Sequence, residues 1–129
     1  MSTVVIDASA ILAAILGEAG GDSVFDLLDE AIVSTVNVAE VYTYAAINEL
    51  PTEAIDAFFA DTGIAIVSFD SVQAVTAGQL ASITRKAGLS LGDRSCLALA
   101  KLRNAEVLTA DRPWQQVAST TGLTITLLR

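Results

Sequence analysis

Short apolar segments alternate with segments of helical periodicity along this whole chain. Apolar runs that predict strands occupy residues 3–6, 31–34, 106–109 and 123–127, and residues 64–68 are expected to be a strand or a buried connector. Helical spacing of apolar residues, with capping and stop signals, predicts helices over residues 9–16, 22–28, 36–48, 52–60, 71–87, 92–103 and 113–118. This alternation predicts an α/β fold in which a central parallel β-sheet is flanked by α-helices on both faces.

The length of 129 residues fits one domain, 1–129, that buries about two thirds of its unfolded surface. Hydrophobic residues make up 53% of the chain, but their runs fall well short of the ~20 residues of a membrane span. The first residues contain no export signal, so we expect a cytoplasmic protein without membrane contact. With one cysteine, Cys96, and no histidine, a metal site in this chain would use oxygen ligands.

Four acidic residues fall where a predicted strand passes into a helix, or in the first turns of that helix: Asp7, Glu40, Asp93 and Asp111. The carboxyl ends of parallel strands meet at one edge of a sheet, so we expect these side chains to share one crevice. Helix capping is the alternative explanation for Asp7 and Asp93, whereas Glu40 lies among apolar residues, where an unpartnered carboxylate is costly.

Four unpartnered carboxylates in one crevice would repel one another, and a bound cation would offset that repulsion. Oxygen ligands select hard ions, so the sequence predicts Mg²⁺ or Mn²⁺. Such ions orient water for attack at phosphorus and neutralise the leaving oxygen, which favours phosphate chemistry.

The formal net charge of -8 argues against a nucleic-acid partner until its distribution is considered. All seven Lys and Arg residues follow position 84, where three acidic residues oppose them, so this part carries +4. The twelve other acidic residues give the first 84 residues -12. We expect either a solvated surface of accidental asymmetry or a small basic rim beside an acidic pocket.

Four segments resemble the successive acidic motifs of PIN-domain nucleases, and in particular those of VapC-like toxins. They are Val5-Ile6-Asp7-Ala8-Ser9-Ala10, Asn37-Val38-Ala39-Glu40-Val41, Leu89-Ser90-Leu91-Gly92-Asp93 and Val107-Leu108-Thr109-Ala110-Asp111-Arg112. The resemblance covers nearly the whole chain and implies a metal-dependent endoribonuclease that hydrolyses RNA. It also implies a homodimer and a VapB-like antitoxin, which lies along a groove and inserts a basic side chain among the acids or displaces the metal.

Carried over by position, Asp7, Glu40, Asp93 and Asp111 match the family's metal-binding and catalytic acids. Thr109 matches the hydroxyl residue before the last acid, and Ser9 the small polar residue that accompanies the first. For both hydroxyl residues, turn or cap chemistry is the alternative to a direct role in binding ligand or water.

Arg94 and Arg112 adjoin two of the acids, so each is expected either to contact RNA or an antitoxin at the pocket rim or to pair with nearby acids. Trp114 is expected in the core rather than stacked on an RNA base.

Two other functions are compatible with parts of this pattern. A PIN-like domain that binds an antitoxin or nucleic acid without cutting would share the fold but needs fewer of the acids. A HAD-like phosphohydrolase also has an Asp after its first strand, but Ser9 stands where its second Asp is expected.

Overall fold

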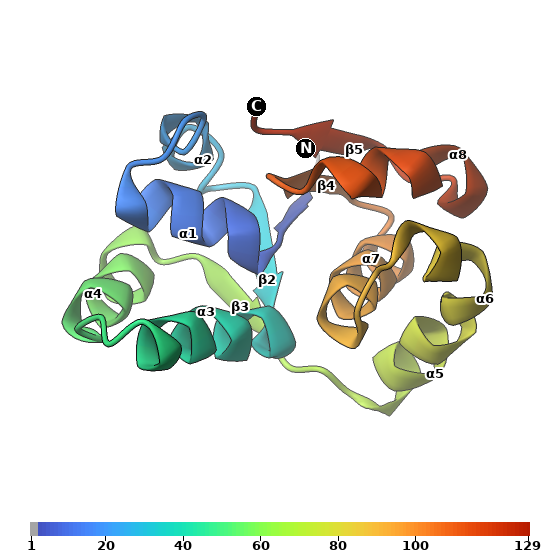
Figure 1. Ribbon diagram of the computed structural model, residues 1–129, viewed down its shortest axis with the longest axis horizontal. Coiled ribbons are helices and arrows are strands. Elements are labelled where there is room, and N and C mark those ends of the chain that lie inside the picture. The colour runs from blue at the N-terminus through green and yellow to red at the C-terminus, as the bar shows by residue number, and fades with distance from the viewer. Residues whose placement is uncertain (1–2) are drawn as a thin grey trace.

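A five-stranded parallel sheet runs through the middle of the molecule in the computed structural model, which describes residues 3–129 (Figure 1). Its strands are β1 (Val4–Ile6), β2 (Ala31–Ser34), β3 (Ala65–Val67), β4 (Glu106–Thr109) and β5 (Ile125–Leu127). Their order is β3-β2-β1-β4-β5, and every neighbouring pair is parallel. The predicted α/β architecture is therefore confirmed, including a strand within residues 64–68.

Helices connect the strands, mostly where apolar periodicity predicts them. They are α1 (Ala8–Leu16), α2 (Asp22–Phe25), α3 (Thr35–Ile47), α4 (Glu53–Thr62), α5 (Ser71–Gln79), α6 (Ala81–Thr84), α7 (Leu91–Arg103) and α8 (Ala118–Thr121), with two 3₁₀ segments, η1 (Arg85–Ala87) and η2 (Arg112–Val117).

The single helix predicted over residues 71–87 is wrong. The chain leaves regular helical geometry at Leu80 and again at Thr84, and it forms α5, α6 and η1 instead. Both residues are buried, and the Thr84 hydroxyl bonds to the carbonyl of Leu80. The helix predicted over residues 113–118 is instead the 3₁₀ segment η2, with Pro113 in its first turn as expected.

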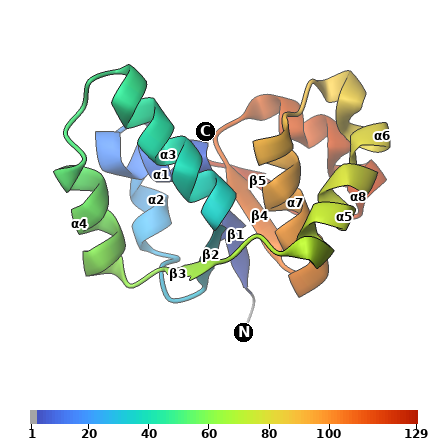
Figure 2. The ribbon, with the colours of Figure 1, turned by 90° about the horizontal axis from the view of Figure 1, so that it is seen from below.

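Helices cover both faces of the sheet, as the views in Figures 1 and 2 show. Alternate strand residues point to opposite faces: Ile6 and Val33 pack in a core with α1, α3 and α4, whereas Val5 and Val107 pack in a second core with α5 and α7. Because β1 contributes to both cores, it is buried over its whole length. Within residues 3–129, no helix has the length and apolar character needed to cross a membrane.

The order of the strands reverses beside β1. The chain builds β1, β2 and β3 toward one edge and then returns to place β4 on the other side of β1. Ligands of parallel α/β sheets bind at such a switch point, beyond the carboxyl ends of the strands. The residues that follow β1 and β4 meet there.

Candidate functional site

Asp7 follows β1 directly and caps α1. Its carboxylate is 3% exposed and accepts a hydrogen bond of 2.9 Å from the backbone N–H of Ala10. The capping role proposed as an alternative for Asp7 is therefore present, and the helix begins at Ala8. The cap also fixes the side chain at the switch point.

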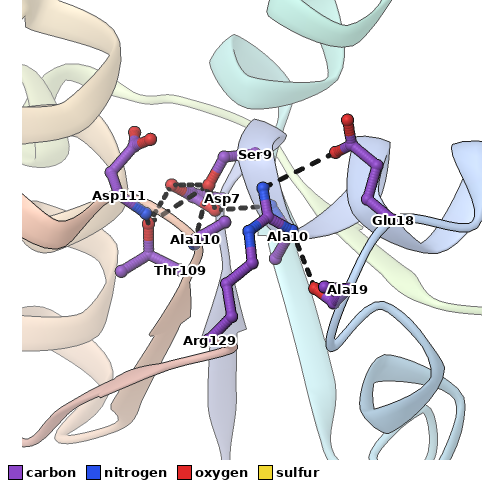
Figure 3. A network of polar contacts seen from close by, with 9 residues as sticks. All are labelled: Asp7, Ser9, Ala10, Glu18, Ala19, Thr109, Ala110, Asp111 and Arg129. Atoms are coloured by element: carbon purple, nitrogen blue, oxygen red, sulfur yellow. Dashed lines mark hydrogen bonds and ion pairs between the residues drawn. The ribbon is translucent and has the colours of Figure 1, made fainter.

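Two hydroxyl groups hold the same carboxylate, one from Thr109 at the end of β4 and one from Ser9 in the first turn of α1 (Figure 3). Thr109 Oγ1 donates to Asp7 Oδ2 over 2.6 Å, and Ser9 Oγ lies 2.8 and 2.9 Å from the two carboxylate oxygens. Each hydroxyl oxygen in turn accepts a backbone N–H: Ser9 from Ala110 at 2.9 Å and Thr109 from Asp111 at 3.0 Å. The orientation of Asp7 is thus set by backbone amides that act through two hydroxyls.

Burial raises the pKa of Asp7 from its ordinary value of 3.8 to about 7. Hydrogen bonds from Thr109, Ala10 and Ser9 favour the carboxylate but do not offset this effect, and the charge of Asp111 raises the pKa further. Without a cation, this carboxyl is only partly ionised at neutral pH.

Asp111 is the first residue before η2, and its side chain makes no capping hydrogen bond. Burial and then the charge of Asp93 raise its pKa, while Arg129 lowers it. Asp93 and Asp111 line one open hollow together with Gly88, Leu89 and Pro113. These two acids therefore face the same space, although 18 positions separate their numbers.

Glu40 lies in the second turn of α3, where Asn37 holds its carboxylate. The amide Nδ2 of Asn37 donates a hydrogen bond of 2.7 Å to Glu40 Oε1 and one of 3.1 Å to the carbonyl of Gly92. Burial raises the pKa of Glu40, the Asn37 hydrogen bond lowers it, and the charges of Asp93 and Asp111 raise it. The electrostatic effects connect Glu40 to the acids of the other half of the molecule.

Asp93 occupies the third position of α7 in a capping box. Its carboxylate accepts a hydrogen bond of 2.9 Å from the backbone N–H of Ser90. The Ser90 hydroxyl in turn accepts one of 3.2 Å from the backbone N–H of Asp93. The capping alternative for Asp93 is therefore present in this conformation, with the carboxylate directed at the start of its own helix.

All four predicted acids lie at the carboxyl end of the sheet, where the charges of neighbouring acids raise the pKa of Asp7, Glu40 and Asp111. Within residues 3–129, however, no three acidic, cysteine or histidine side chains lie close enough to share one metal ion. Cys96 is buried beneath the acids, where burial raises its thiol pKa well above the ordinary value. Oxygen is thus the only donor chemistry that the crevice offers.

The donor set fits a hard divalent cation. The carboxylates are partly desolvated and mutually repelling, and the buried Asn37 Oδ1 has no hydrogen-bond partner among residues 3–129. A buried oxygen without a donor is a natural partner for water or a cation.

The basic residues beside the acids make contacts that sequence did not predict. Arg94 donates 2.9 Å to the carbonyl of Ala77 and so ties α7 to α5, while Arg112 is exposed. Neither pairs with an acid in the described part of the chain, where the one ion pair joins Arg129 to Glu18 at 3.7 Å. The expectation that Trp114 belongs to the core is confirmed, because its side chain is 1% exposed.

Sequence reasoning missed two residues at this site, Asn37 and Arg129. Asn37 precedes Glu40 by three positions, a helical spacing that brings side chains together, so the signal was present. Arg129 carried none. Its guanidinium bonds to the carbonyl of Ala19 at 2.8 Å (Figure 3) and is near enough to Asp111 to lower the pKa of that carboxyl, because β5 returns the chain to this edge of the sheet.

Comparisons with known proteins agree on the fold. A family model described as "PIN domain" matches residues 4–119. The structure resembles DNA-bound VapBC from Salmonella typhimurium (TM-score 0.76, 16% identity, 100% of both chains) and FitAcB from Neisseria gonorrhoeae (0.75, 18%, 98% of both chains). It also resembles a toxin-antitoxin complex from Klebsiella pneumoniae (0.73, 16%, 98% of both chains). The comparison with curated proteins finds no significant match.

Proposed function

Because the chain belongs to the PIN-domain family, we propose that it is a metal-dependent endoribonuclease and the toxin of a toxin-antitoxin pair. One observation carries this proposal: carboxylates from four separate segments lie at one sheet edge, where neighbouring acid charges raise the pKa of Asp7, Glu40 and Asp111. Such a cluster is destabilising by itself and is stabilised by a divalent cation.

In this proposal side-chain rotation brings Asp7, Glu40, Asp93 and Asp111 together to hold Mg²⁺ or Mn²⁺, since carboxylate oxygens are the ligands these ions prefer. When bound, the ion supplies charge neutralisation at a phosphodiester and lowers the pKa of the attacking water. Ser9 and Thr109 keep the Asp7 carboxylate oriented by hydrogen bonds rather than by binding the ion themselves.

A basic rim supports RNA as the substrate. Arg85 and Lys86 are exposed on η1, which packs against η2, where Arg112 is exposed. Ala87, the residue after Lys86, lines the same hollow as Asp93 and Asp111, so these basic residues lie at the border of the acids. Cations in this position suit the phosphates that flank a scissile bond.

An apolar groove supports a protein partner. Leu12, Ile15 and Leu16 of α1 line it together with Tyr44 of α3 and Leu50. Leu16 is 41% exposed, and Tyr44 and Leu50 are each 38% exposed, so the groove presents apolar surface to solvent. We propose that an apolar segment of a VapB-like antitoxin occupies it, by analogy with the VapBC and toxin-antitoxin structures that share the fold.

The proposed homodimer rests on a different surface. Val72 and Val75 of α5 are 59% and 61% exposed, and Leu102 of α7, which lines one hollow with Val72, is 45% exposed. A second copy of this chain would cover them. Light scattering of the purified protein tests this, since Val72→Lys with Val75→Lys should convert a dimer to a monomer without unfolding it.

Cleavage of total cellular RNA by the purified protein tests the activity, with Mg²⁺ or Mn²⁺ and against EDTA. Discrete fragments should require both the metal and Asp7, so Asp7→Asn should abolish cleavage. Asp61→Asn, an exposed acid on α4, is the matched control and should cut normally.

The competing function is a PIN-like module that binds its partner without cutting. The engagement of Asp93 with Ser90 favours it, because this carboxylate is occupied by its own helix. RNA that remains intact, with Mn²⁺ binding shown by calorimetry, would support the binding module. Absence of metal binding would contradict the nuclease proposal itself.

A further inference from the structure

Asn37 is a deeply buried polar side chain beside the acids. It is 1% exposed, and both of its N–H groups are used: one reaches Glu40 Oε1 and the other the carbonyl of Gly92. A carboxylate and a carbonyl only accept hydrogen bonds, so the orientation of the amide is unambiguous. Asn37 thereby links α3 to the first turn of α7 across 55 positions of sequence.

Gly92 forms the other wall around the same carboxylate. A Cβ built on Gly92 would lie 2.2 Å from Glu40 Oε2 and 2.5 Å from its Cδ. The carboxylate therefore rests directly on the backbone of α7, a position that no residue except glycine allows without displacing it. Gly92 has no positive φ, so contact and not backbone conformation requires glycine here.

We propose that Asn37 and Gly92 form a clamp that positions the Glu40 carboxylate for the divalent cation. Asn37 is a positioning residue in this inference, since it acts through Glu40, and Gly92 supplies the space. The inference rests on the proposed function for the presence of the cation, but the contacts that define the clamp belong to the metal-free chain.

The clamp explains how α3 contributes an acid to a site built mainly on other elements. Glu40 follows the end of β2 by six positions, whereas Asp7 and Asp111 follow their strands within two. A long side chain at that distance has several rotamers, and one of them is fixed here by Asn37 on the same helix together with Gly92 on α7. Gly92 immediately precedes Asp93, so the same turn of α7 that carries one acid also places another.

Mn²⁺ affinity without RNA tests the clamp, with free Mn²⁺ measured by electron paramagnetic resonance. Loss of a residue that orients a metal ligand typically weakens binding about 10- to 100-fold, and we expect this for Asn37→Ala and Gly92→Ala. In a Glu40→Ala background both substitutions should have little further effect, because the ligand that they position is gone.

Matched controls separate positioning from general destabilisation. Gln73→Ala also removes a buried amide, one that bonds to the carbonyl of Ser68 away from the acids. Gly78→Ala adds a methyl group inside α5, where a Cβ meets nothing within 4 Å. Both controls should bind Mn²⁺ like the parent chain.

A thermal-unfolding cycle without metal provides the second readout. Asn37→Ala and Glu40→Ala should shift the melting temperature non-additively, because the two side chains share one hydrogen bond. Affinity of folded Asn37→Ala within twofold of the parent would overturn the clamp, as would additive effects with Glu40→Ala. A parent chain that binds no Mn²⁺ would overturn the proposed function as well, so the two failures are distinguishable.

Discussion

Thr109 donates a hydrogen bond of 2.6 Å to Asp7, although 102 positions separate the two residues in the chain. The same hydroxyl oxygen accepts the backbone N–H of Asp111. Thr109→Val keeps the shape of the side chain but leaves that N–H without its acceptor, at a cost of roughly 1–3 kcal/mol. Urea unfolding should show this loss for Thr109→Val and a smaller one for Thr109→Ser; equal losses would contradict the hydroxyl's role.

Asp7 should make the metal-free protein less stable as the pH rises. Its pKa is about 7 in the folded chain against 3.8 ordinarily, so its contribution is complete below pH 4 and is lost as the pH rises through 7. The full loss is roughly 4 kcal/mol. The Asp7→Asn variant has no carboxyl to ionise and so avoids this loss. Its free energy of unfolding should therefore rise relative to that of the parent between pH 4.5 and pH 8.

Urea unfolding in EDTA at those two pH values measures that difference. Asp61→Asn, which neutralises an exposed carboxyl on α4, is the control. A difference between Asp7→Asn and the parent that stays constant with pH would contradict the raised pKa.

Arg129 should set the pH at which metal binds. It lowers the pKa of Asp111, and metal ligands must be deprotonated, so Arg129→Ala should move the midpoint of Mn²⁺ binding to higher pH. Arg129→Lys keeps the charge and should move it less. Because the ion pair with Glu18 is exposed, stability should change by less than about 1 kcal/mol. Mn²⁺ titrations across pH 5.5–8 would reveal the shift, and an unchanged midpoint would count against it.

The basic rim should govern RNA affinity rather than stability. We expect Arg85→Glu with Lys86→Glu to weaken RNA binding and to lower its salt dependence by about 0.7 to 1 per lost phosphate contact. The measurement uses an Asp7→Asn background, so that RNA is not cut. Lys101→Glu with Arg103→Glu is the control. It reverses the same number of positive charges, but at the end of α7 that lies away from Asp93, and should have little effect on RNA binding. Similar losses for both pairs would indicate only a response to net charge.

Gly21 should tolerate no side chain. A Cβ there would lie 2.2 Å from the carbonyl oxygen of Ala13, so Gly21→Ala forces α1 and α2 apart, at a cost of roughly 1–3 kcal/mol. Gly78→Ala should instead stabilise the protein by about 0.5–1 kcal/mol, since α5 gains helix propensity without a clash. Thermal unfolding of both variants checks the opposite signs.

The sheet and the placement of the acids could be predicted because they depend on local pattern. Asp7 and Asp111 follow apolar strands directly, and parallel strands present such residues at one edge. The end of α5 at Leu80 could not be predicted from the sequence. Leu80 and Thr84 are both buried and keep the i, i+4 spacing of a continuous helix.

The orientation of each acid also lies beyond sequence reasoning. The Asp93 side chain can point into the crevice or toward the backbone N–H of Ser90, and its position in the sequence is compatible with both orientations. The orientation of the Glu40 carboxylate is set by the hydrogen bond from Asn37 and by the absence of a side chain at Gly92, which is 52 positions away in the sequence. Such choices depend on which donors the tertiary fold brings within reach.

The position of β1 between β2 and β4 has a consequence for the growing polypeptide. A ribosome completes β1 first, but this strand has an unpaired edge until residues 106–109 have emerged. Only then does Thr109 reach Asp7. A nascent chain therefore contains its first acid long before it contains the partners that orient it, and the proposed nuclease site forms only once β4 has been added. The proposed activity would therefore arise only after the chain has been translated beyond Asp111, the last of the four acids.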